Sequence, residues 1–452
     1  MTVLHPEGVD RALLLKTLLV AALAIALMLP VAMIRELVAE RQARRNEAVA
    51  GIAEGWGRAQ TVAGPYLAIP YERHWTEVKR DTLDGKLREV RTERSESHVL
   101  RLPVADATWT LDADIGEKAR GIYKARLYGA KLGVQGSIDV PARARFEDGT
   151  SRYKWHTARL VLGISDPHGI RAASDMSLGG ASYAFAPGSG DAAMAGGLHA
   201  SLGDLDLSKS QRLDFSLMFE IAGSEALSIA PLGADTAVSI RANWPHPSFQ
   251  GRFLPLRHEI GPDGFNATWK ISRFAAQGAA QGPSCAFPCN RMGEQLSVSL
   301  IEPVGLYLQL ERASKYGYLF IGLTAAAFML IELLRRLAIH PVQYTLVGLA
   351  LAMFFLLLTA LSEHLGFAAA YAAATAACVG VITVYLMRVL HNPALGLAFG
   401  GALAALYTIL YALLKAEDYA LLGGSLLLFG LLAGVMLATR RIDWYALRLR
   451  GA

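Results

Sequence analysis

The stretch FFLLLTALSEHLGFAAAYAAA, residues 354–374, is apolar apart from one polar triplet in its middle, Ser362, Glu363 and His364. Crossing a hydrocarbon core about 30 Å thick takes roughly 20 mainly apolar residues in a helix. Uncharged sequence continues on both sides of the triplet for about that length. The stretch therefore predicts two membrane-spanning helices, with the triplet in the turn between them.

Further apolar runs extend this interpretation to much of the chain. Of its 452 residues, 53% are hydrophobic and 18% are charged, whereas a typical soluble domain is about 25% charged. Six transmembrane helices are predicted, an anchor at 17–38 and a five-helix bundle at 316–439. We expect the anchor to be retained, because no small-x-small cleavage site follows it. The uncharged runs are 17–34, 316–331, 341–362, 365–387, 392–414 and 419–439.

The basic residues of the bundle predict its orientation. Arg335, Arg336 and Arg388 lie on one side together with the C-terminal arginines, while the turns SEHLG and KAEDY hold only Lys415. Lys and Arg concentrate in cytoplasmic loops. We therefore expect both termini in the cytoplasm, and this explains the net charge of +5 without a nucleic-acid partner. The predicted order is a cytoplasmic N-terminus (1–16), an amphipathic connector (39–60), a periplasmic domain (61–313) and a basic cytoplasmic tail (440–452).

The predicted periplasmic domain shows a period of two. Segments such as GIYKARLYGAKLGVQGSIDV (121–140) and QRLDFSLMFEIAG (211–223) alternate apolar and polar residues. Turn sequences such as FEDGT and GPDG separate many of them. This pattern is typical of antiparallel β structure, so we predict a large all-β domain, a sandwich or an open barrel. The Gly- and Ala-rich passage 177–197 is expected to be a long loop or a weak edge.

The domain carries no recognisable catalytic or cofactor motif. It lacks a phosphate-binding loop, a G-x-S-x-G elbow and an H-E-x-x-H pair, so we expect no cofactor. Cys285 and Cys289 lie in the predicted exported part, where disulfides persist. A structural disulfide, two free thiols and, less favoured, a metal site all stay open for this pair, because its spacing matches no zinc or redox signature.

Polar residues in the two predicted outward turns are the first candidate functional residues. We interpret them as solvated turns that dock the exported domain. A proton or metal site, or a Ser362 nucleophile with His364 as its base, are the alternatives. The nucleophile is disfavoured because the two residues are close together on a short turn, without an oxyanion loop. The candidates are Ser362, Glu363, His364, Lys415, Glu417 and Asp418.

Glu332 is the acid embedded most deeply in a predicted span. Arg335 and Arg336 follow at helical spacing, so we expect an interfacial ion pair on one helix face. An ionisable group within a span is also a functional hypothesis by default. The alternative is a proton relay through Glu332 and His340, which precedes Pro341 at a predicted helix start.

Several segments of the chain form a distinctive set: GFNATW (264–269), RASKYGYLF (312–320), the run HPVQYTLVGLALAMFFLLLTALSEH (340–364) and TRRIDWY (439–445). Together they resemble the CreD family of bacterial inner-membrane proteins. The resemblance extends from about Gln60 to Tyr445. It implies production under a two-component system that responds to carbon source and envelope state, and links to envelope integrity, β-lactam response and colicin tolerance. It implies no catalytic residues.

The sequence thus favours a non-enzymatic inner-membrane protein that supports envelope integrity. In this interpretation the helices are embedded in the lipid bilayer, and the β domain binds an envelope protein, lipid or glycan. The alternative is a membrane enzyme that acts on an envelope lipid or glycan at the outer face of the bundle. A transporter is disfavoured because the helices are mostly uninterrupted. The oligomeric state stays open.

Overall fold

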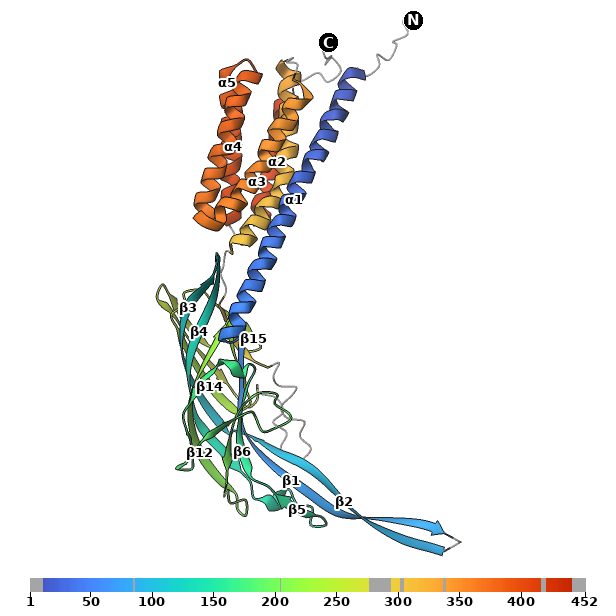
Figure 1. Ribbon diagram of the computed structural model, residues 1–452, viewed down its shortest axis with the longest axis vertical. Coiled ribbons are helices and arrows are strands. Elements are labelled where there is room, and N and C mark those ends of the chain that lie inside the picture. Colours follow the sequence, from blue (N-terminus) through green and yellow to red (C-terminus); the bar gives the residue numbers. More distant parts are fainter. Residues whose placement is uncertain are drawn as a thin grey trace. The chain divides into compact units, whose positions relative to one another are not determined.

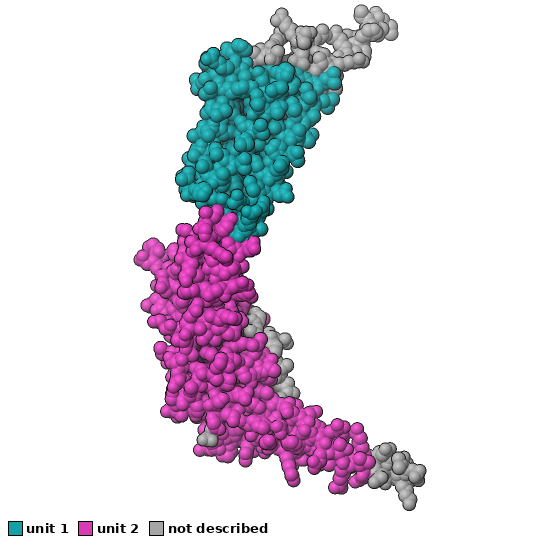
Figure 2. Space-filling view, in the orientation of Figure 1, with its two compact units in different colours: residues 1–46, 303–452 teal, residues 47–302 magenta. Residues whose placement is uncertain are grey.

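The computed structural model describes residues 11–83, 86–203, 205–275, 294–300, 305–335, 339–415 and 420–440. The chain divides into two compact units (Figure 2). Residues 1–46 and 303–452 form the first, which we call the helical unit. Residues 47–302 form the second, the β unit. Cys285 and Cys289 lie outside the described residues, so their pairing stays a prediction.

Six α-helices are described along the chain (Figure 1). Five of them are long and apolar enough to cross a membrane. The described apolar stretch of the sixth helix covers only Leu422–Gly434, so the count of six spans stays a prediction. The triplet at 362–364 lies near the boundary of two long apolar helices, but it belongs to the last turn of α3 and Ser362 is buried, so the expectation of a solvated turn between the spans is wrong for this residue. The helices are α1 (Arg11–Trp56), α2 (Leu306–Arg335), α3 (Pro341–Leu365), α4 (Phe367–Val389), α5 (Pro393–Lys415) and α6 (Ala420–Thr439).

Aromatic rings and small residues pack the helical unit. The ring of Tyr407 lies 4.4 Å from that of Phe354 and 4.8 Å from that of Phe320, measured between centroids. Its carbonyl accepts a 2.7 Å hydrogen bond from the Tyr371 hydroxyl. At Gly348 an added Cβ would lie 2.2 Å from a methyl of Leu27. Glycine thus lets α1 and α3 approach closely, as small residues do between membrane helices.

The β unit contains two described sheets of nine strands each. The main path of one sheet runs β10-β11-β6-β1-β13-β18-β15, and that of the other runs β16-β17-β14-β3-β4-β12-β8-β9. Beyond β5, the strands β1 and β2 continue as a two-stranded ribbon (Figure 1). The strands are β1 (Gln60–Leu83), β2 (Lys86–Pro103), β3 (Asp106–Arg120), β4 (Tyr123–Val140), β5 (Arg152–Trp155), β6 (Ala158–Ile164), β7 (Ile170–Ala173), β8 (Met176–Leu178), β9 (Ala181–Tyr183), β10 (Phe185–Pro187), β11 (Gly197–Leu202), β12 (Gln211–Ser224), β13 (Ala226–Pro231), β14 (Asp235–Ala242), β15 (Pro247–Gly251), β16 (Arg257–Gly261), β17 (Gly264–Ile271) and β18 (Leu296–Leu300).

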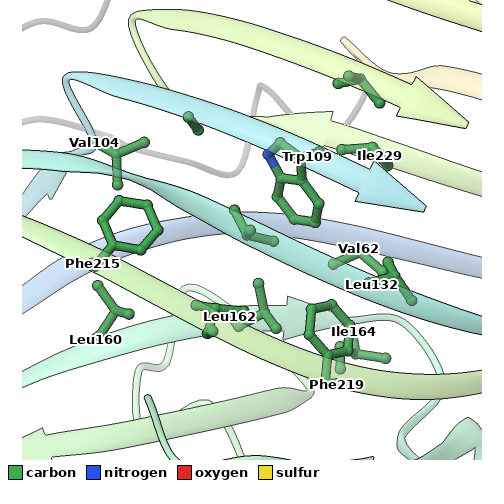
Figure 3. Close-up of a cluster of buried hydrophobic side chains, with 14 of the residues drawn as sticks. Val62, Val104, Trp109, Leu132, Leu160, Leu162, Ile164, Phe215, Phe219 and Ile229 are labelled. Atoms are coloured by element: carbon green, nitrogen blue, oxygen red, sulfur yellow. The ribbon is translucent and has the colours of Figure 1, made fainter. Parts of the chain in front are cut away.

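The two sheets share one apolar core. Val62 and Leu162 belong to one sheet, and they pack in the same buried cluster as Trp109, Leu132 and Phe215 of the other (Figure 3). Burying each large apolar side chain contributes about 1.5–3 kcal/mol. The apolar residues of each alternating segment face this core, and the polar residues face away from it. The predicted β domain is present.

The expectation of purely antiparallel structure is wrong at two places. The strands β1 and β13 pair in parallel, and so do β3 and β14. Hairpin neighbours must be antiparallel, but strands joined by long connections are free to pair in either direction. Both parallel pairs join strands more than a hundred residues apart. Periodicity within a strand carries no information about such pairings.

The end of α1 is fixed within the β unit by Trp56. Its Nε1 donates to the Tyr128 carbonyl at 3.2 Å, and Lys118 Nζ lies 3.7 Å from its ring centroid. At Gly57, φ is +139° and an added Cβ would lie 2.5 Å from the Ala222 carbonyl oxygen. Glycine is required there because other residues avoid this conformation.

Candidate functional site

Glu332 is a buried carboxylate in α2, with 2% of its surface exposed. Its Oε1 forms an ion pair with Lys16 of α1 and accepts a 2.9 Å hydrogen bond from the Ile339 amide. Its Oε2 accepts a 2.7 Å hydrogen bond from the hydroxyl of Tyr344 in α3. Lys16 also donates to the Ile339 carbonyl at 3.1 Å. The buried carboxylate therefore has a counter-charge from Lys16 and hydrogen-bond donors for both of its oxygens, and the cluster joins α1, α2 and α3.

Glu332 has a described partner that sequence reasoning did not propose. The side chains of Arg335 and Arg336 lie outside the described part of the chain, so the expected ion pair with them stays a prediction. Lys16, which the sequence interpretation missed, is separated from Glu332 by 316 positions. The available signal was its place directly before the uncharged run 17–34, because charges that end two spans on the same side lie at similar depth.

His340 caps the N-terminus of α3. Its Nδ1 accepts a hydrogen bond from the Val342 amide at 3.3 Å, and its own amide donates to Gln343 Oε1 at 3.1 Å. Pro341 occupies the first turn, where a missing N–H costs nothing. This reciprocal arrangement is a capping box. No contact among the described residues links the imidazole to Glu332, so the relay stays an untested hypothesis.

The polar residues in the last turn of α3 have separate environments. Ser362 is buried, and its hydroxyl donates to the Thr359 carbonyl of its own helix at 2.9 Å. His364 is exposed. Residues two apart on a helix do not face each other. The structure thus places a buried hydroxyl and an exposed imidazole at this turn, an arrangement that does not favour a nucleophile and its base.

Glu363 makes contacts that join helices. Its Oε1 accepts a 3.1 Å hydrogen bond from the hydroxyl of Tyr307 in α2. Its Oε2 lies 3.8 Å from a guanidinium nitrogen of Arg41 in α1. Both partners were missed by the sequence interpretation, because their separation in sequence hides the proximity. Glu363 therefore ties α3 to α1 and α2.

The second predicted outward turn is described only at its start. Lys415 ends α5, and its Nζ lies 5.3 Å from the ring centroid of Tyr411. Glu417 and Asp418 fall outside the described residues, and so does any meeting of the two turns. Within the described ranges, no group of three or more His, Cys, Asp or Glu side chains is placed to hold a metal ion.

Asp191 forms a buried polar cluster in the β unit that sequence reasoning did not find. Arg101 donates to both carboxylate oxygens at 2.6 Å, and the Tyr66 hydroxyl and Ala193 amide donate at 2.9 and 3.0 Å. Burial opposes ionisation, but these hydrogen bonds hold the pKa of Asp191 below its usual value. The passage 177–197 contains the short strands β9 and β10, each at the end of its sheet's path, and this fixed carboxylate, so the weak-edge alternative describes it better than a long loop.

Two solvent-facing clefts occur in the described β unit. One, of about 430 Å³, lies on the outer face of the sheet at β3, β4, β12 and β14. The other, of about 510 Å³, lies beside the β2–β3 turn and is lined by Arg145, Arg212 and Arg273 among others. Two of these arginines are paired with carboxylates, Arg212 with Asp106 and Arg273 with Asp235.

Apolar helices with internally paired polar groups, together with a large two-sheet unit, define a multi-pass membrane protein with a β domain. A family model described as Inner membrane protein CreD matches residues 12–445. The inner membrane protein CreD of Escherichia coli strain K12 is 33% identical over 434 residues, covering 94% of this chain and 92% of that protein. The chain belongs to the CreD family of inner membrane proteins.

Similarity to solved structures is low. An M1 zinc metallopeptidase from Deinococcus radiodurans matches with a TM-score of 0.21 and 9% identity, covering 44% of this chain and 42% of that one. Leukotriene A4 hydrolase from Saccharomyces cerevisiae matches with a TM-score of 0.20 and 9% identity, covering 45% and 30%. The chain thus spans less than half the length of these enzymes, and such scores carry no conclusion about fold or activity.

Proposed function

We propose that this CreD-family protein is a non-enzymatic inner-membrane protein that supports the integrity and stress response of the cell envelope. In this proposal six spans keep both termini in the cytoplasm, and the β unit faces the periplasm. The β unit binds an envelope ligand or partner through its surface.

The observation that carries the proposal is that polar side chains at the ends of the spans form hydrogen bonds within the helical unit. The Ser362 hydroxyl bonds within its own helix, while Glu363 and Glu332 bond to neighbouring helices. Residues engaged in this way stabilise the helix assembly. The clefts of the described β unit, in contrast, are open to solvent. Both features support binding by the β unit in preference to chemistry at the turn.

Substitution at the turn separates this function from an envelope-directed enzyme. We expect Ser362→Ala to retain envelope tolerance, because only one intrahelical hydrogen bond is lost. Glu363→Gln should reduce tolerance in proportion to its loss of thermal stability. The measurement is β-lactam and colicin tolerance of a deletion strain that expresses each variant at matched protein level.

The matched control is Thr408→Ala, which removes another intrahelical hydroxyl bond, to the Ala404 carbonyl, at a position away from the turn. Complete loss of tolerance in Ser362→Ala, with unchanged stability and with Thr408→Ala unaffected, would overturn the non-enzymatic proposal. That result would favour an enzyme at this turn.

A further inference from the structure

Four charged side chains form a row across the outer face of one sheet in the β unit. In the strand register Arg241 of β14 lies opposite Asp112 of β3, and Asp112 lies opposite Lys131 of β4. Lys131 in turn lies opposite Glu220 of β12. Residues paired in this way share a face of the sheet. The row therefore reads positive, negative, positive, negative across four adjacent strands.

The charges of this row are accessible to solvent. Lys131 Nζ and Glu220 Oε1 are 3.8 Å apart, and their side chains are 79% and 47% exposed. Arg241 and Asp112 are exposed as well. Exposed pairs at this separation hold each other weakly. A ligand can therefore compete for these groups without breaking a buried interaction.

A second row, of small or flexible side chains, lies beside the first. Ser239, Thr110, Gly133 and Met218 occupy the same four strands in register. Gly133 leaves the centre of the face without a side chain, and an added Cβ there would lie 2.8 Å from Thr110 Oγ1. Both rows line the cleft of about 430 Å³. The cleft thus combines a hollow, hydroxyl groups and exposed charges of both signs.

We propose that this cleft binds a short peptide segment that carries both ammonium and carboxylate groups. The row contributes two cations and two anions, so only a ligand with both signs can pair with all of them. A purely anionic ligand would meet Asp112 and Glu220. A neutral glycan would cover four charges and supply none in return, and unpaired charges are costly to remove from water. This inference rests on the proposed function, since it names the ligand class of the β unit.

The test is calorimetric titration of the purified full chain in detergent with the tetrapeptide Ala-Glu-Lys-Ala. We expect saturable binding that weakens as salt is added, because exposed charges are screened. The double variant Asp112→Asn with Lys131→Gln should bind about tenfold more weakly, since two exposed charge contacts are lost. The variant Gly133→Leu should also lose binding because it fills the hollow.

The matched control is Glu117→Gln with Lys124→Gln. This pair lies on the same two strands, with Lys124 Nζ 3.4 Å from Glu117 Oε2, and does not line the cleft. We expect it to bind as the wild type does, with the two double variants melting at similar temperatures. Equal binding by both double variants, binding of an N-acetylglucosamine oligomer in place of the peptide, or no peptide binding would overturn the inference. Such a result would not decide the proposed function, which is tested separately by β-lactam and colicin tolerance.

Discussion

At the scale of single residues, the pair formed by Lys16 and Glu332 makes the sharpest stability prediction. Lys16→Met leaves the Glu332 carboxylate buried without its counter-charge. Breaking a buried pair on one side costs about 3–5 kcal/mol, and Lys16 is partly exposed, so we expect the lower end of that range. The measurement is thermal unfolding of the detergent-solubilised chain.

The control for this prediction is the double variant Lys16→Met with Glu332→Gln. Tyr344 and the Ile339 amide can still donate to the glutamine side-chain oxygen, so we expect the double variant to recover part of the lost stability. Non-additivity of this kind is what a direct interaction produces. A Lys16→Met variant as stable as the wild type would contradict a stabilising role for the pair.

The lowered pKa of Asp191 predicts that the stability of the β unit depends on pH in the acidic range. Its pKa is below the ordinary value of 3.8 in the folded chain. A lowered pKa adds stability that is complete above the unfolded value and is lost as the pH falls through the folded one. We expect Asp191→Asn to be less stable at neutral pH and to show a flatter fall below about pH 4. The measurement is unfolding followed by tryptophan fluorescence across this range, and parallel curves would contradict it.

The sequence predicted which polar residues are noteworthy better than it predicted their partners. Glu332, Glu363 and His340 were identified because charged or capping residues are conspicuous beside apolar runs. Lys16 and Tyr307 were not, because contacts between helices depend on packing that no local pattern encodes. Asp191 was missed for a related reason, since its Arg101 partner comes from a distant strand.

At the scale of secondary-structure elements, the close approach of α1 and α3 depends on Gly348. Gly348→Leu places side-chain atoms where Leu27 already lies, and overpacking costs about 1–3 kcal/mol or more. We expect a lower melting temperature and a partial rescue by adding Leu27→Ala. Gly380→Leu on α4 is the control, because nothing lies within 4 Å of an added Cβ there. Equal effects of the two glycine variants would contradict this packing.

The strands illustrate how far periodicity extends. Alternating residues predict the strands β4 and β12, because a strand with one buried face alternates apolar and polar side chains. The order of strands in the two sheets was not predicted. Register and direction between distant strands depend on which faces meet in the core, and two of those pairings are parallel.

At the scale of the whole molecule, the division into helices and strands follows from how apolar residues are distributed along the sequence. Runs long enough to span a bilayer and segments of period two have little overlap in this sequence, so the two units were expected. The sixth span was not settled, since its described apolar stretch ends at Gly434. The function is the hardest property to predict from the sequence, because a binding surface is made by side chains from strands that are far apart in the sequence.

The export of the β unit is the central claim of the proposed function. Pro262 and Asp263 form the exposed turn between β16 and β17, so an epitope inserted between them should leave the paired strands intact. The decisive measurement is antibody and protease access to this epitope in spheroplasts with an intact inner membrane. We predict full access without permeabilisation; an epitope that is reached only after the membrane is opened would contradict export of the β unit.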